Sequence, residues 1–172
     1  IGSGAVANTF IGSNAGYSNT TGHSNTSLGY GAIYANNTGF ENTAIGRQAF
    51  ATNTIGTENT ATGFKAGFYN ISASRNIAIG NYALYGQAYD PGFVWNSDNV
   101  AVGHSALYFN QPTSTSNGIY NTAIGNFSLY HNNTGYYNTA AGYNALYNNT
   151  TGFKNTAMGS AALFSNTIGI YN

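Results

Sequence analysis

The chain is built from one short motif that returns every 17 residues. The motif Asn-Thr-Ala-Ile-Gly recurs, with small variations, at nine places along the 172 residues. Its asparagine is found at Asn8, Asn25, Asn42, Asn59, Asn76, Asn99, Asn121, Asn138 and Asn155. The spacing departs from 17 only between Asn76 and Asn121, where it is 23 and then 22. A repeat of this extent predicts a single domain over residues 1–172.

With the asparagine as position 0, the unit reads Asn-Thr-Ala-Ile-Gly-x-x-Ala-Leu-Tyr-x-Asn-x-Thr-Gly-x-x. Helical repeats need about 33 residues or more, so this unit is too short for a helix pair. Glycine and asparagine tolerate left-handed backbone conformations and therefore mark turns between short strands. The pattern predicts an all-β fold, a parallel β-solenoid (β-roll or β-helix) of about nine coils. We expect strands near positions 0–4 and 7–11 of each coil.

The direction in which each strand faces has two interpretations, because alternate residues of a strand point to opposite sides. If positions 0, 2 and 4 face inward, each coil is thin and Thr-x-Ile forms an outer face too apolar to leave in water. Burying that face between copies would produce an oligomer, most naturally a homotrimer. If Thr and Ile face inward, each chain has its own core and alanine lines a flat exterior. The first interpretation is preferred, and position 2 is small in nearly every unit.

Composition excludes several classes of protein. Only 5% of residues are charged, the formal net charge is +0, and four scattered basic residues cannot form a nucleic-acid-binding surface. The absence of cysteine excludes disulfides and thiolate metal sites. The apolar runs are much shorter than the ~20 residues of a membrane-spanning helix, so no membrane insertion is expected. We therefore expect an assembling or surface-attached protein, outside the cell or on a cell or virion surface.

The motif resembles known repeats. Asn121–Gly125 together with Ala145–Tyr147 is similar to repeats of tail-fibre-like proteins and to the Ser-Val-Ala-Ile-Gly repeat of YadA-like heads in trimeric autotransporter adhesins. The adhesin heads are trimeric left-handed parallel β-rolls that display a binding surface. The resemblance therefore implies a trimeric β-roll with a role in fibre structure or adhesion. It supplies no catalytic residues.

The two insertions, about 85–98 and 108–120, are the main departures from the repeat. They belong to consecutive units, so we expect the two loops to emerge from the same edge and touch each other. Insertions in repeat proteins often carry a binding face. The residues that could form an aromatic platform with a polar rim for a sugar are Tyr89, Asp90, Phe93, Trp95 and Tyr108. The alternative is a structural bulge or a contact between chains.

Two repeat positions suggest further surface features. Position 9 is usually aromatic and predicts a ladder of stacked rings, either for packing or for glycan binding. Position 11 lies in an expected turn and carries Asn-x-Ser/Thr sequons, which makes the protein a possible glycoprotein. The preferred glycosylation candidates are Asn19, Asn36, Asn70, Asn132 and Asn149.

The ionisable residues suggest no catalytic or metal site. Glu41 and Glu58 occupy the same position one unit apart, but a solvated corner explains them better than paired acid–base catalysis. The three histidines, His23, His104 and His131, occupy different positions and form no ladder. The glycine-rich turns lack the helix and lysine of a phosphate loop. We expect no enzyme activity, no cofactor and no metal.

These observations favour a structural fibre or adhesin segment that assembles with itself. The assembly would be a homotrimer or an end-to-end filament. The filament interpretation comes from the two ends of the chain. Ile1-Gly2-Ser3 resembles Ile11-Gly12-Ser13, and Asn172 would open a tenth unit. Neither end resembles a cap, so the open strand edges could stack on a neighbouring copy. The alternatives are an ice-binding solenoid, suggested by threonine at position 1, and a carbohydrate-binding module that recognises surface glycans.

Overall fold

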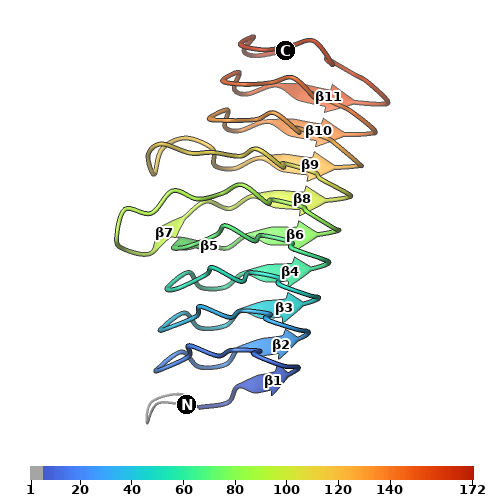
Figure 1. The fold of residues 1–172 in the computed structure, drawn as a ribbon. Helices are drawn as coiled ribbons and strands as arrows, with labels where there is room; N and C mark the ends of the chain where they lie inside the picture. Colours follow the sequence, from blue (N-terminus) through green and yellow to red (C-terminus); the bar gives the residue numbers. More distant parts are fainter. Residues whose placement is uncertain (1–5) are drawn as a thin grey trace.

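The computed structural model describes residues 6–172 and shows a parallel β-solenoid whose coils stack in sequence order (Figure 1). Residues 1–5, and with them the expected uncapped start of the chain, lie outside the described residues. The strands are β1 (Thr9–Ile11), β2 (Thr26–Leu28), β3 (Thr43–Ile45), β4 (Thr60–Thr62), β5 (Ala73–Ser74), β6 (Ile77–Ile79), β7 (Trp95–Asn96), β8 (Val100–Val102), β9 (Thr122–Ile124), β10 (Thr139–Ala141) and β11 (Thr156–Met158). The described residues contain no helix, and so none that could cross a membrane.

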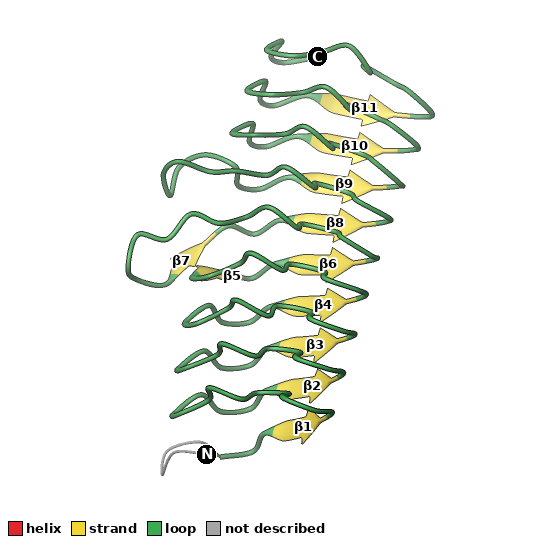
Figure 2. Cartoon of the chain, viewed as in Figure 1, coloured by secondary structure: helices red, strands yellow, loops and turns green. Residues whose placement is uncertain are grey.

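One parallel sheet runs the length of the solenoid. Its order is β1-β2-β3-β4-β6-β8-β9-β10-β11, so each coil adds one strand (Figure 2). Equivalent repeat positions pair directly, as in Thr9↔Thr26 and Ala78↔Ala101. The insertions leave this register intact, because Val100 still pairs with Thr122. The repeat therefore sets the register of the whole sheet.

The strands expected at positions 7–11 do not form, and that prediction is wrong. The structure has turns there instead, with left-handed residues at positions 6 and 8, such as Tyr82 (φ 59°) and Leu84 (φ 50°). Such residues cannot continue an extended strand. Hydrogen bonds between coils continue nevertheless, for example from the Leu84 amide to the Ala106 carbonyl at 2.9 Å. The coil thus has one strand side and one side of stacked turns.

The core is thin and lies between these two sides. Alanine at position 2 points inward from the strands and meets Ala at position 7 and a large apolar residue at position 8. Phe50, Leu84 and Leu129 are among the fully buried large side chains. Position 8 is buried in every coil but the last, where Leu163 is exposed, even though its backbone is left-handed. Burial therefore offsets a conformational cost of roughly 1–2 kcal/mol per residue.

Two asparagine ladders close the remaining interior. At position 0, the Asn8 Oδ1 accepts a hydrogen bond from the Asn25 amide at 2.8 Å. At position 11, the Asn36 Nδ2 donates to the Asn19 Oδ1 at 2.7 Å and to the Gly39 carbonyl at 3.0 Å. These bonds repeat along the stack and satisfy polar groups that would otherwise be buried without partners.

Candidate functional site

The strand side presents one continuous outer face, which we call the Thr/aliphatic face. It consists of positions 1 and 3 of the nine strands of the large sheet, namely Thr9, Ile11, Thr26, Leu28, Thr43, Ile45, Thr60, Thr62, Ile77, Ile79, Val100, Val102, Thr122, Ile124, Thr139, Ala141, Thr156 and Met158. The inward direction of alanine selects the first of the two strand orientations considered from the sequence. The Thr/aliphatic face is therefore outside the chain's own core.

Apolar side chains on this face are exposed to an unusual degree. Ile11 is 57% exposed, Ile124 48% and Met158 75%. No charged residue occupies positions 1 or 3 of any unit. Soluble monomers rarely expose contiguous apolar patches of this extent, and larger patches mark interaction surfaces.

The two insertion loops meet, as their positions in consecutive units suggest. Tyr89 and Asp90 line a hollow of about 390 Å³ together with Gln111 and Pro112 of the second loop. The Asn110 Nδ2 also donates to the Gln87 Oε1 at 3.0 Å. The loops therefore form one protrusion on the side of the coil away from the large sheet (Figure 1).

The five candidate platform residues do not form one surface. Trp95 is buried on β7, pairs with Ala73 of β5 and meets the Tyr89 ring edge-on at a centroid distance of 5.7 Å. The Asp90 Oδ1 accepts a hydrogen bond from the Gly92 amide, and Phe93 is 58% exposed. Tyr108 lines an adjacent hollow of about 290 Å³ and belongs to the position-9 ladder. Tyr89 and Trp95 thus touch each other, while Phe93 lines neither hollow.

Gln87 is a residue whose role the sequence analysis missed. It occupies position 11 of its coil, where other units have asparagine. Its Oε1 accepts from the Asn99 Nδ2 at 3.1 Å, and its Nε2 donates to the Ser97 Oγ at 2.7 Å. The longer side chain joins the first insertion to the internal ladder. The sequence does carry a signal for this role, because Gln87 lies 11 residues after Asn76 and so holds the position of the ladder asparagines.

The glycosylation candidates at position 11 directly follow the turn of each coil, and the structure places them inside the coil. Asn19, Asn36, Asn70, Asn132 and Asn149 are all buried. Each Nδ2 donates inside the coil, as the Asn132 Nδ2 does to the Gly135 carbonyl at 2.9 Å. A glycan on these nitrogens would have to replace internal hydrogen bonds.

The position-9 residues form the expected ladder of rings along one corner of the solenoid. Consecutive rings stack at centroid distances of 4.9–5.7 Å, as in Tyr85–Tyr108 and Phe68–Tyr85. Burial is the main cause that raises the pKa of Tyr85 to about 12, with help from a hydrogen bond to Tyr69. Burial also raises the pKa of Tyr108 and of Tyr130.

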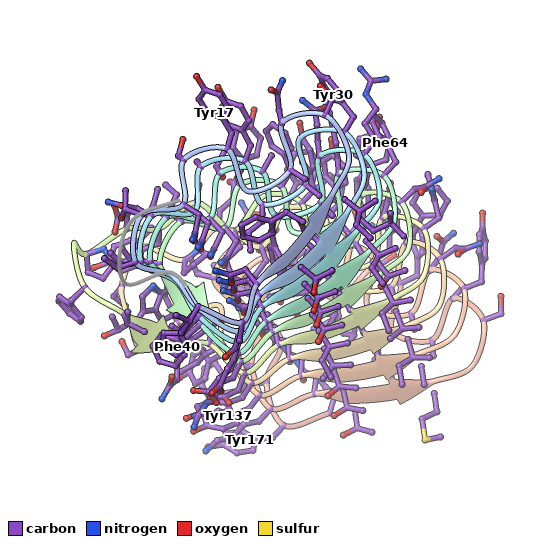
Figure 3. All side chains as sticks on the ribbon, turned by 90° about the horizontal axis from the view of Figure 1, so that it is seen from below. Tyr17, Tyr30, Phe40, Phe64, Tyr137 and Tyr171 are labelled. Atoms are coloured by element: carbon purple, nitrogen blue, oxygen red, sulfur yellow. The ribbon has the colours of Figure 1, made fainter. Side chains whose placement is uncertain are left out.

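A second aromatic corner lies at positions 15 and 16. Tyr136 stacks on Phe153 at 4.7 Å, and Tyr120 stacks on Tyr137 at 4.9 Å. Viewed along the axis, Tyr17, Tyr30 and Phe64 lie at one corner, and Phe40, Tyr137 and Tyr171 at another (Figure 3). The strand side runs between these corners, because position 16 precedes each strand and position 5 follows it.

Most of the ionisable residues lie on these outer corners, while Asp90 lies in the first insertion. Glu41 and Glu58 are exposed at position 16, where the next two coils carry Arg75 and Asp98. Arg75 and Asp98 form an ion pair at 2.8 Å, and the hydrogen bond to Asp98 raises the pKa of Arg75. Residues 6–172 contain no group of three histidine or acidic side chains arranged to hold a metal ion. The three histidines contact aromatic rings: His23 stacks on Phe40 and His131 on Phe109 at 5.3 Å, whereas His104 meets its neighbours edge-on.

Comparison of the chain with protein-family models, with curated proteins and with solved structures gives no significant match.

Proposed function

We propose that this protein is a structural rod, a fibre or adhesin segment outside the cell, that assembles with copies of itself through the Thr/aliphatic face. The observation that carries the proposal is the exposure of that face over nine consecutive strands. Each strand contributes the same two outward positions, so the face is regular and can match the same face on another copy. A homotrimer is the assembly that the resemblance to trimeric adhesin heads favours.

Charge supports self-association. The formal net charge is +0, so copies of the chain do not repel one another over long range. Burial of the Thr/aliphatic face would desolvate hydroxyls and methyl groups but no ionised side chain. The charged residues near the strand side lie at the corners, where they would remain in water, as on the polar rim of many interfaces.

Mass in solution tests this proposal. Light scattering after gel filtration is expected to give about 54 kDa for a trimer of the 18.0 kDa chain. The double variant Ile79→Lys/Ile124→Lys places charges on the exposed face without touching the core and is expected to be monomeric. Val94→Lys is the matched control, since Val94 is 45% exposed in the insertion loop, and it should assemble as the wild type does. A monomeric wild-type protein, or unchanged assembly of the double variant, would refute the proposal.

Ice binding is a second candidate, favoured by the threonines in register at position 1. Thr9, Thr26, Thr43 and Thr60 pair in succession on β1–β4. Ile77 and Val100 interrupt this row before it resumes at Thr122. A monomer that shows thermal hysteresis would favour this function over self-assembly. The absence of thermal hysteresis would exclude ice binding.

A further inference from the structure

The position-9 ladder has one missing ring. Tyr17 stacks on Tyr34 at 5.1 Å and nearly parallel, and Phe68 begins an unbroken series that continues to Phe164. Between Tyr34 and Phe68 the position is held by Ala51. The two rings on either side of the gap therefore face a space where every other described coil has an aromatic side chain.

A cavity of about 520 Å³ occupies this place. Tyr34, Ala51 and Phe68 line it, together with Gly31 and Gln48. Gly31 is itself exceptional, because every other described unit carries a side chain at position 6. The aromatic ring missing at Ala51 and the side chain missing at Gly31 therefore leave space at the same corner, and together they form the cavity.

The spacing between the rings of Tyr34 and Phe68 suits one planar ring. Ladder neighbours stand 5.1 Å apart in the Tyr17–Tyr34 step, so two steps separate Tyr34 from Phe68 by about 10 Å. A ring placed midway would lie about 5 Å from each, within the 4.5–7 Å of favourable aromatic pairs. The slot therefore has the geometry of the ladder's own rungs.

Two cations lie against rings that line the cavity, although neither cation lines it itself. The Arg47 Cζ lies 6.0 Å from the centroid of the Tyr30 ring, which lines the cavity. The Lys65 Nζ lies 5.1 Å from the centroid of Phe68. Among the described residues the ion pair is Arg75–Asp98, so neither cation is paired with a carboxylate. Glu41 and Glu58 belong to position 16, beyond the strand side from this corner.

We propose that this cavity is a binding site for a small aromatic acid whose ring inserts as the missing rung between Tyr34 and Phe68. The acidic group would face Arg47 and Lys65. The cavity lies at a corner and shares no residue with the Thr/aliphatic face. Binding is therefore independent of whether the rods assemble through that face.

The experiment uses 4-hydroxyphenylacetate, which carries the ring of the absent tyrosine and a carboxylate. Its small size limits the expected dissociation constant to roughly the millimolar range, so saturation-transfer NMR is the suitable method. The wild-type protein should transfer saturation to the ring protons. Ala51→Tyr restores the rung and should reduce binding at least tenfold without lowering the unfolding midpoint. Tyr130→Phe, which keeps every rung, should bind as the wild type does.

Two further measurements separate ring from charge. Arg47→Gln/Lys65→Gln keeps the slot and should weaken the acid severalfold while leaving binding of the uncharged 4-hydroxyphenylacetamide unchanged. Cyclohexylacetate, which has the charge but no planar ring, should bind much more weakly than the aromatic acid. No saturation transfer with the wild type, wild-type affinity in Ala51→Tyr, or equal binding of cyclohexylacetate would overturn the proposal.

Discussion

Asparagine side chains supply hydrogen bonds between the coils of this solenoid, in addition to those of the backbone. The position-0 amide oxygens accept from the backbone of the next coil, as between Asn59 and Asn76 at 2.9 Å. The position-11 amides bridge successive coils and also donate to a carbonyl three residues later. An amide can donate and accept at once, whereas a carboxylate can only accept. Replacement by aspartate therefore tests this role directly.

We expect Asn132→Asp to destabilise the fold by about 3–5 kcal/mol at neutral pH. The Asn132 Nδ2 donates to the Gly135 carbonyl and, at 3.1 Å, to the Asn110 Oδ1, so a carboxylate would place negative oxygen against two acceptors. Denaturant unfolding measures the change. Asn126→Asp is the control, because exposed Asn126 uses only its oxygen, at 2.8 Å from the His104 amide, and should change stability by less than about 0.5 kcal/mol. Equal effects would contradict the ladder's role.

At the scale of the elements, a three-residue strand is kept in register by the corner that follows it. Position 4 is glycine in all nine units, and its backbone lies directly against the glycine of the next coil. At Gly80, φ is 126°, and an added Cβ would lie 2.5 Å from the Gly103 carbonyl oxygen. The stack can therefore close at this corner only where no side chain is present.

Gly80→Ala is expected to cost about 2–5 kcal/mol, the sum of a left-handed alanine and a clash with backbone that cannot move aside. Gly92→Ala provides the comparison. Gly92 also has positive φ, at 80°, but an added Cβ would meet nothing within 4 Å, so about 1 kcal/mol is expected. Thermal unfolding of both variants separates crowding from backbone strain. A Gly80→Ala protein as stable as Gly92→Ala would show that the corner is not closely packed.

The whole molecule places most of its aromatic residues outside its core, and Phe50 and Trp95 are the buried exceptions. Alanine and leucine fill the thin interior, while the rings stack along two corners. Tyrosine hydroxyls therefore sit close together along one edge, and ionising one of them is opposed by burial and by its neighbours. The stability of the folded rod is therefore expected to decrease at alkaline pH, where these tyrosines ionise.

We expect stability to fall between about pH 10 and 12. The pKa of Tyr85 is about 12 in the folded chain against 10.0 as its ordinary value, so over this range the folded state holds a proton that the unfolded state has lost. The contribution is fully present below pH 10 and is lost as pH rises through 12. Thermal unfolding across this range measures the fall, and Tyr85→Phe should make it shallower. An identical pH dependence in that variant would contradict the assignment.

Much of the architecture could be predicted from the sequence. The 17-residue period predicted the parallel solenoid and the register of every strand in the large sheet, and the two irregular spacings located the insertion loops. Equivalent residues must align when identical units stack, so the period carries this information without any knowledge of the coil's shape. The aromatic ladder was predicted for the same reason.

The tertiary structure decided between the two strand orientations considered from the sequence and what else lies inside each coil. Position 11 was expected in a turn but is an internal amide ladder. Positions 7–11 were expected to be a strand but form turns, in which residues such as Leu84 at position 8 are left-handed and buried. The cavity at Ala51 depends likewise on Gly31 of the preceding coil, which lies 20 residues away in the sequence. By itself the sequence determined the repeat, its register and its interruptions, because these follow from spacing. Which side chains face inward and which gaps coincide follow from how the chain closes each coil, which only the folded structure determines.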